Sequence, residues 1–334
     1  MRGSVYYRRR KSKQKENEMI KDMKDTAKCP QCRSRQVIKK GKRKGPFGIT
    51  QMYRCKTCGR SFGEKPLKNT KYPARVIFQA LNLYNQGHTL EETSRSLNKQ
   101  FKLKTGKTTV HSWIQRYQDL CPIVSLRDNF KKNRAVVFSK QFEHENLDYL
   151  FMYHDYKLRV FAQRRFPGLV SYIERFEQGC PDEFFEVGKR CSQPLFQVSV
   201  KPKKKVNLAC RMSRFAILPR QSNRDRHTLV EQFMLINDTA TIASEVPVWY
   251  WEKNVDSGVT GHIDLLQVRG GKVYILDYKP GASQEKKAPQ QLYHYAAALS
   301  FRAKVPFESI RCAWFDENAY FEFSPSDAVA KLIK

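Results

Sequence analysis

The chain has 334 residues, 40% of them hydrophobic, so it is long enough for two or three folded units with real cores. Its net charge is +30, and residues 1–70 carry 22 Lys or Arg against 5 Asp or Glu, a surplus of 17, which favours a polyanionic partner. No run of about 18 apolar residues and no signal-peptide core is present, so the sequence predicts no membrane partner and a cytoplasmic location, nucleoid-associated if prokaryotic.

The N-terminal segments predict a basic arm followed by a metal site. Residues 1–27 are polar, charged and without hydrophobic period, as in a disordered arm. Residues 28–66 hold two C-x-x-C pairs separated by 22 residues, Cys29 with Cys32 and Cys55 with Cys58. Four thiolates on two tight turns can close a tetrahedral shell around a structural Zn²⁺ ion.

Two strand-like stretches, 35–40 and 50–54, lie between the cysteine pairs and are joined by a Gly-rich loop, so we expect a zinc ribbon. The basic residues around the ribbon are the reason to expect DNA as its ligand. The candidates are Lys42, Arg43, Lys44 and Arg54.

After a short polar joint at 67–71, residues 72–120 predict three helices. The first spans 72–86, and Thr89 with Glu92 forms a capping box for the second. Thr108 or Thr109 can cap the third. This spacing favours a helix-turn-helix DNA-binding domain over a helical connector with a solvated face. The side chains expected to reach DNA from the third helix are Thr109, His111, Ser112, Gln115 and Arg116.

The two cysteine pairs and the three helices together resemble the N-terminal half of insertion-sequence transposases. The resemblance covers residues 28–119, from CPQC and YRCKTCGRSF to TTVHSWIQRY. It implies DNA recognition by a zinc ribbon and a helix-turn-helix, and it leaves the chemistry open.

Residues 121–195 predict either a helical connector or an N-terminal extension of the domain that follows. Amphipathic helices are expected around Leu147–Tyr153, Leu158–Phe161 and Leu169–Phe176, with breaks at Pro167 and at Gly179–Pro181. Asp155 falls within this helical pattern.

From residue 196 to 334 the sequence pattern becomes typical of strands, at 196–200, 243–251, 263–268 and 273–278. A helix is expected at 289–302. Asp264 lies on one strand, Gly270 and Gly271 turn the chain, and Asp277 and Lys279 share one face of the returning strand. Burying carboxylates costs free energy unless a cation compensates their charge. These residues therefore predict a Mg²⁺ or Mn²⁺ site that positions a water for attack on a phosphodiester.

The pattern G-x-x-D, then D-Y-K-P, then Gln291 to Tyr295 resembles the PD-(D/E)XK nuclease superfamily and, within it, the RecB-like branch. The resemblance covers residues 225–300. It implies an α/β core with a mixed sheet flanked by helices, and Asp264, Asp277, Lys279, Gln291 and Tyr295 as catalytic residues, with Gln290 a neighbouring candidate. The whole chain would then be a multidomain α+β protein.

Members of that branch use an upstream His or Glu as a further metal ligand. His227 and Glu231 lie one helical turn apart and are the candidates, with Glu245 as the competitor. Some relatives carry an iron–sulfur cluster held by one cysteine before the core and three after it. Since Cys312 is the only cysteine beyond Lys279, no cluster is expected here, and Cys121, Cys180, Cys191 and Cys210 read as ordinary cysteines.

Three functions remain open from the sequence. The first is a Mg²⁺- or Mn²⁺-dependent deoxyribonuclease directed to DNA by its own N-terminal domains, with possible mobile-element or defence partner proteins and a possible homodimer. The second is a DNA-binding regulator whose nuclease fold is inactive. The third is a transposase with an RNase H-like acidic triad, for which Asp155 would have to supply the first acid. RNA is a less favoured substrate, because no RNA-module signature is present.

Overall fold

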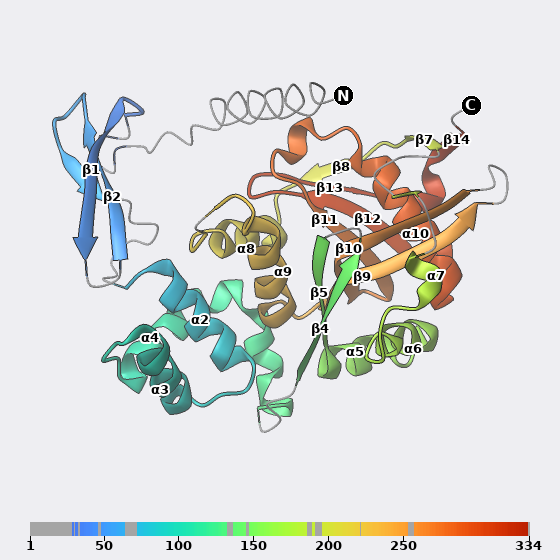
Figure 1. The fold of residues 1–334 in the computed structure, drawn as a ribbon, viewed down its shortest axis with the longest axis horizontal. Coiled ribbons are helices and arrows are strands. Elements are labelled where there is room, and N and C mark those ends of the chain that lie inside the picture. Colours follow the sequence, from blue (N-terminus) through green and yellow to red (C-terminus); the bar gives the residue numbers. More distant parts are fainter. Residues whose placement is uncertain are drawn as a thin grey trace, which may run out of the picture. The chain divides into compact units, whose positions relative to one another are not determined.

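The computed structural model describes residues 29, 31–32, 34–45, 48–63, 72–131, 136–144, 147–185, 189–190, 196–220, 222–252 and 257–332. The expected basic arm at 1–27, the joint at 67–71, Cys191 and the side chain of Lys44 lie outside the described residues. Contacts divide the chain into two compact units, residues 1–73 and residues 74–334 (Figure 1).

The first unit holds a small antiparallel sheet in the order β1-β2-β3. Its strands are β1 (Val37–Gly45), β2 (Gly48–Cys55) and β3 (Ser61–Gly63). The hairpin predicted between the two cysteine pairs is therefore present. Gly41 has a φ of 116°, at a shift in the β1–β2 register where a side chain would strain the backbone.

The second unit begins with three helices, α2 (Ala74–Asn85), α3 (Leu90–Phe101) and α4 (Lys107–Tyr117). The predicted capping box of α3 is confirmed, because the Glu92 amide donates to Thr89 Oγ1 at 3.1 Å and the Thr89 amide donates to Glu92 Oε2 at 3.0 Å. The predicted cap of α4 is wrong. Gly106 is the N-cap and makes no side-chain bond, while Thr108 and Thr109 already lie inside the helix.

The turn between α3 and α4 is held by the side chain of Asn98 rather than by a threonine cap. Asn98 Oδ1 accepts from the Thr105 amide at 2.8 Å, and Asn98 Nδ2 donates to the Thr105 carbonyl at 2.9 Å. Ser94 Oγ donates to the same carbonyl at 2.6 Å. These bonds from α3 side chains to the backbone of Thr105 hold the turn that leads into α4.

Among the described residues, nine strands form one mixed sheet in the second unit, ordered β4-β5-β9-β10-β11-β12-β13-β8 with β6 beside β10. The strands of this sheet are β4 (Val137–His144), β5 (Leu147–His154), β6 (Lys189–Arg190), β8 (Lys203–Lys205), β9 (Thr241–Glu252), β10 (Ser257–Arg269), β11 (Lys272–Tyr278), β12 (Ile310–Phe315) and β13 (Tyr320–Phe323). The parallel neighbours β11 and β12 are joined through α10 (Ala288–Ala303). A separate two-stranded ribbon pairs β7 (Phe196–Ser199) with β14 (Val329–Leu332).

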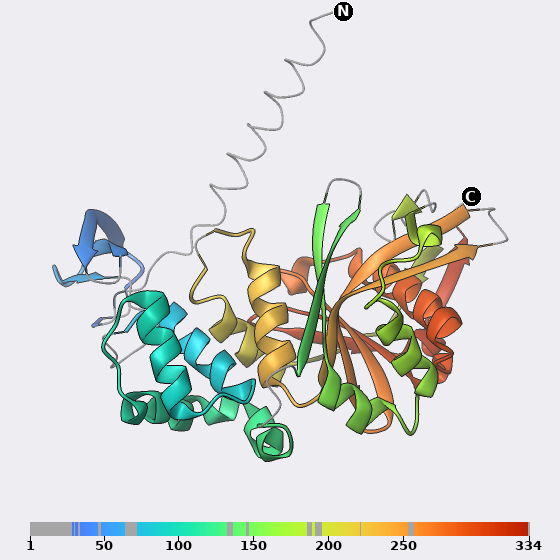
Figure 2. The same ribbon diagram turned by 60° about the horizontal axis from the view of Figure 1, so that its bottom comes forward.

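The hairpin β4–β5 corrects one prediction. A helix over Leu147–Tyr153 is wrong, because these residues form β5, which pairs with both β4 and β9 (Figure 2). The spacing of Leu147, Leu150 and Tyr153 fits a helical face, yet residues 151–154 are all buried, as in a strand that is covered on both faces. Within the segment 121–195, strands β4 and β5 therefore extend the sheet, so the segment is not wholly helical.

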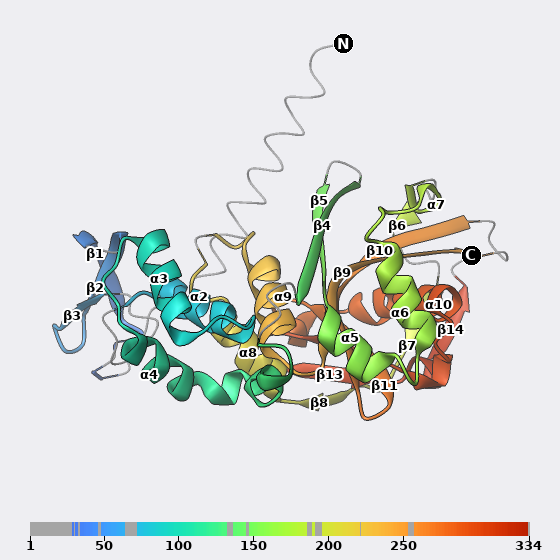
Figure 3. The same ribbon diagram turned by 90° about the horizontal axis from the view of Figure 1, so that it is seen from below.

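Two groups of helices pack on this sheet (Figure 3). The first comprises α5 (Asp155–Ala162), α6 (Pro167–Arg175) and α10, which enclose the main hydrophobic core, and α7 (Asp182–Phe185) contacts β9. The second comprises α8 (Leu208–Ala216) and α9 (Arg226–Asn237), and α9 packs on β9 and β10. None of the described helices has the length and apolarity that a bilayer span requires.

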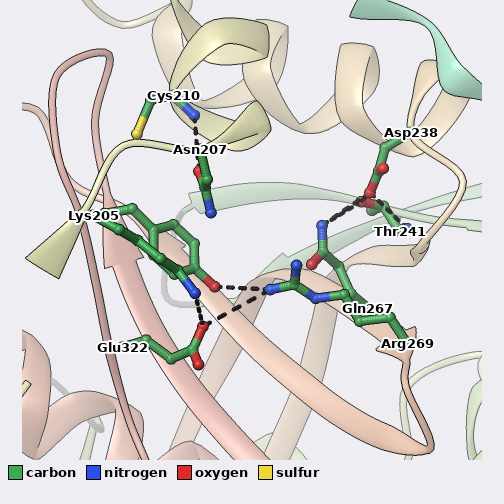
Figure 4. A network of polar contacts seen from close by, with 9 residues as sticks. Lys205, Asn207, Cys210, Asp238, Thr241, Gln267, Arg269 and Glu322 are labelled. Atoms are coloured by element: carbon green, nitrogen blue, oxygen red, sulfur yellow. Dashed lines mark hydrogen bonds and ion pairs between the residues drawn. The ribbon is translucent and has the colours of Figure 1, made fainter. Parts of the chain in front are cut away.

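A polar network fixes the far end of β10 (Figure 4). Arg269 donates to the Tyr320 hydroxyl at 3.1 Å, and Lys205 on the neighbouring strand β8 lies 2.9 Å from Glu322. Gln267 donates to Asp238 at 2.9 Å, just beyond the end of α9. These contacts hold β10 against β13 and against the α9–β9 connection, and so they fix the strand that carries Asp264.

Candidate functional site

Four cysteines come together at the base of the β1–β2 hairpin. Their sulfur atoms all lie within 4.8 Å of one another. The close pairs each join one residue from each C-x-x-C turn, Cys29 with Cys58 and Cys32 with Cys55, both at 3.6 Å. Four thiolates bound to Zn²⁺ at about 2.3 Å lie about 3.8 Å apart, so this arrangement fits a zinc ion.

The backbone around the second C-x-x-C turn favours the thiolate form that a metal requires. Hydrogen bonding from the backbone of Cys58, and then of Thr57, lowers the pKa of the Cys55 thiol to about 6. The predicted DNA-binding side chains of Lys42 and Arg43, toward the tip of the hairpin, and of Arg54, beside the cluster, are exposed. Their role stays a prediction.

Zinc removal is expected to unfold the first unit and leave the second folded. The first unit has a three-stranded sheet, and few of its described residues are buried apolar ones, so the metal is expected to supply much of its folding free energy. Limited proteolysis after treatment with a strong chelator should cut within residues 28–66 and spare residues 74–334. Cys32→Ser should behave like the chelated protein and Cys180→Ser like the wild type. Zinc release without new cleavage in 28–66 would contradict the structural role.

Three carboxylates lie in one row across the centre of the sheet. Continuing the pairing of Leu265 with Leu276 by one residue sets Asp264 opposite Asp277. On the other side, the pairs that flank Asp264 place it opposite Glu245 on β9. Asp277 is fully buried and Asp264 is 9% exposed. Glu245 has a φ of 50°, a strained value for a residue with a side chain, of the kind retained at functional sites.

Helix α9 brings two further groups to this row. His227 and Glu231 lie one turn apart, and together with Asp264 they place ligand atoms within 4.8 Å of one another. His227 Nδ1 is 3.5 Å from Asp264 Oδ2. Both candidate upstream ligands therefore reach the acid on β10, while their competitor Glu245 also faces His262, at 3.9 Å.

Strand β11, which follows the Gly270–Gly271 turn, and the residue after it contact both Asp264 and Asp277. The Tyr278 amide donates to Asp264 Oδ2 at 2.9 Å, and Lys279 Nζ lies 3.0 Å from Asp277 Oδ2. The side chain of Lys279 is 25% exposed, so the lysine lies at the edge of the buried cluster. The predicted grouping of Asp264, Asp277 and Lys279 is thus present in the fold.

Burial disfavours the charged form of most carboxylates in this cluster, so they gain from a proton or a bound cation. Burial, followed by the charge of Asp264, raises the pKa of Asp277 from its ordinary 3.8 to about 7, and burial raises the pKa of Glu245 to about 8. Burial also raises the pKa of Glu231 well above its usual range. Burial opposes ionisation of Asp264, but the hydrogen bond from His227 and its charge outweigh burial and lower its pKa.

The donor set fits a divalent metal ion. Glu231 Oε1 is buried and has no hydrogen-bond partner among the described residues, as expected for an oxygen that completes its coordination with a ligand. Carboxylate oxygens with one imidazole suit Mg²⁺ or Mn²⁺. Asp264, Asp277, His227 and Glu231 are the residues that would hold it.

Comparison with known proteins supports the same interpretation. The model of the PD-(D/E)XK nuclease superfamily matches residues 97–319, about two thirds of the chain. The chain belongs to the PD-(D/E)XK nuclease superfamily. The match includes β4, β5 and the strands that carry Glu245, Asp264 and Asp277. No curated protein and no solved structure matched the chain.

Membership in the superfamily indicates nuclease activity in general, with divalent metals as the usual cofactors and DNA as the implied substrate. The finer residue roles stay predictions. Gln291 and Tyr295 face each other on α10, where Gln291 Nε2 donates to the Tyr295 hydroxyl at 2.7 Å. Helix α10 packs on β11, the strand that carries Asp277, and Gln290 lies at its start.

One neighbour of the cluster was not anticipated from sequence. His262 is buried, stacks on Tyr149 of β5 with ring centroids 3.5 Å apart, and lies two residues before Asp264 on the same face of β10. Its position in the G-H-I-D segment was the available signal. Its stacking partner could not be found, because the sequence pattern around Tyr149 favours a helix.

The raised pKa of Asp277 predicts how stability depends on pH without added divalent metal. Between pH 3.8 and about 7 the folded state holds a proton on Asp277 that the unfolded state has lost, so stability falls as pH rises through this window. Asp277→Asn removes the effect. At pH 8 the variant should be more stable than the wild type by about 2–4 kcal/mol, and near pH 4 the two should be equal. Urea unfolding at both pH values tests this, and parallel curves for the two proteins would contradict it.

Proposed function

We propose that this protein is a Mg²⁺- or Mn²⁺-dependent DNA nuclease of the RecB-like branch, directed to its target by the zinc ribbon and by α2–α4 acting as a helix-turn-helix. The observation that carries the proposal is the meeting of His227 and Glu231 from α9 with the carboxylate row of β9–β11. A buried acidic cluster beside a partly exposed lysine is suited to phosphodiester hydrolysis.

The protein's own groups have separable tasks in this reaction. The Tyr278 amide and His227 hold Asp264 in place and ionised. Asp277 holds the ammonium of Lys279, whose pKa is raised: burial opposes its charge, but Asp277 and then Asp264 outweigh burial. Lys279 therefore stays protonated and can stabilise the negative charge that develops on the phosphate. A bound divalent ion would lower the pKa of the attacking water and neutralise phosphate charge.

DNA binding by α4 is supported by the exposure of its outer face. His111, Ser112, Gln115 and Arg116 are exposed, and Thr109 is half-buried. The opposite face of α4 is buried through Val110, Trp113 and Ile114. Such a helix can enter a major groove without disturbing its own core.

The substrate assignment is tested by equilibrium binding of duplex DNA and duplex RNA between 50 and 300 mM salt. We expect tighter binding of DNA and a steep loss of affinity with salt, because the excess positive charge displaces counterions. Gln115→Ala with Arg116→Ala should weaken binding of DNA, whereas Lys272→Ala on the β10–β11 turn should not. Equal binding of both nucleic acids, or a flat salt dependence, would contradict the assignment.

A further inference from the structure

The helices proposed to bind DNA and the helix that carries the metal-site residues share one buried interface. Asn237 on α9 accepts from Asn85 of α2 at 2.7 Å and donates to Asn82 of α2 at 2.7 Å. All three side chains are at most 5% exposed. Although Asn85 Oδ1 has no partner among the described residues, the two hydrogen bonds between buried amides fix how α2 packs on α9.

Aromatic contacts extend this interface from α4 to α2. The ring centroid of Tyr117, the last residue of α4, lies 5.0 Å from that of Phe215 of α8. The ring centroids of Phe215 and Phe233 of α9 are 5.1 Å apart. Phe233 in turn lies 5.3 Å from Phe78 of α2. Four rings from four helices thus pack in a continuous series, at separations typical of stabilising aromatic pairs.

A third contact holds the same C-terminal end of α2. The Arg127 side chain donates from Nε to the Tyr84 carbonyl at 2.8 Å and also bonds the His88 carbonyl. Its guanidinium lies 3.9 Å from the centroid of the Tyr84 ring. Arg127 belongs to the 3-10 helix Pro122–Asn129, which itself contacts α9. The C-terminal end of α2 is therefore tied to the nuclease core, and Phe78 ties the middle of the helix to α9.

Helix α9 is common to both sides of this arrangement. Phe233 and Asn237 pack on α2, while His227 and Glu231, about three and two turns before Asn237, face Asp264. Within residues 107–131, which the structure describes without a gap, α4 contacts α2, and the 3-10 helices Gln118–Leu120 and Pro122–Asn129 contact α8 and α9, so this stretch is not a flexible linker. A ten-residue flexible linker would spread the distance between two modules by about 17 Å, or about five base pairs.

From this geometry we infer that the protein is an endonuclease that cuts at one fixed distance from the sequence bound by α4, with Asn82, Asn85 and Asn237 as positioning residues that set that distance. The inference rests on the proposed function. One base-pair step is about 3.4 Å. A close-packed interface allows smaller relative displacements of α4 and the metal-site residues than this. The substrate class is therefore duplex DNA with a recognition sequence and an offset scissile bond.

The test maps cut positions on DNA. A random duplex library is first bound to the full-length Asp277→Asn variant, which selects the preferred sequence. That sequence is then placed between random flanks on a closed circle, cut by the wild type in Mg²⁺, and the new ends are sequenced. We expect most cuts to fall within one or two nucleotides of a single offset. Cuts spread through the flanks would overturn the inference while leaving the nuclease intact, whereas absence of cutting would overturn the proposed function as well.

Interface variants separate positioning from catalysis. Asn82→Ala with Asn85→Ala should broaden the distribution of cut positions several-fold while total cutting continues. Phe78→Leu provides a milder change in the same interface should the double variant not fold. The matched control, Ser300→Ala, removes a 2.7 Å hydrogen bond to the Val305 carbonyl at the end of α10 and should leave the distribution unchanged. An unchanged distribution in both folded interface variants would overturn the role of these residues.

Discussion

Asp277→Asn is expected to reduce DNA cleavage by roughly 10³-fold or more while leaving DNA affinity unchanged. Asp277 is fully buried, faces Asp264 across the β10–β11 pair and holds Lys279 at 3.0 Å. An amide of the same shape keeps the packing but loses the charge that would hold a divalent cation. Since it also removes a buried ionisable group, the same substitution should stabilise the fold at pH 8.

Opposite effects on activity and stability make this variant informative. A variant that is merely misfolded would lose both, so unfolding curves must accompany the kinetics. Glu308→Gln provides a matched control, because Glu308 is an exposed carboxylate just before β12, at the opposite end of the β11–β12 pair from Asp277. Cleavage by Asp277→Asn within tenfold of the wild type would exclude Asp277 from the metal site.

Lys279→Met is expected to lower the rate of cleavage by about 10²–10³-fold with little change in metal affinity. The side chain length is retained, but the ammonium that faces Asp277 is lost. Single-turnover rates at saturating Mn²⁺ separate the two effects, because a purely structural role for Lys279 would change the metal concentration needed and not the maximal rate.

Removing the lysine also leaves Asp277 without its ion-pair partner. The pKa of Asp277 should therefore rise further, and the onset of cleavage with pH should move to higher pH. Lys286→Met, on the exposed segment that precedes α10, is the control. If the maximal rate of Lys279→Met equals that of the wild type, the charge-stabilising role is wrong.

The parts of the fold that the sequence could predict are those whose signals are local. The Thr89–Glu92 capping box, the two cysteine pairs and the Gly270–Gly271 turn each act within a few residues, and each is found as expected. The approach of His227 and Glu231 to Asp264 was predictable only as a possibility, since their helical spacing fixes a common face but not what that face meets.

The features that could not be predicted from the sequence depend on contacts between residues that are distant along the chain. Leu147–Tyr153 has helical spacing, yet it forms β5 because β4 and β9 supply hydrogen-bond partners that no local pattern reveals. The same holds for Glu245, whose place beside Asp264 depends on the β9–β10 register, and for the Asn82–Asn85–Asn237 network, whose members lie more than 150 residues apart.

The most direct measurement compares wild type and Asp277→Asn on linear and closed circular DNA, each with Mg²⁺, with Mn²⁺ and without added divalent metal. The site described here predicts that only the wild type cuts, only with metal, and on circular as well as linear DNA. Equal cutting by both proteins, or wild-type cutting that needs no metal, would show that the carboxylate row of β9–β11 is not the catalytic centre.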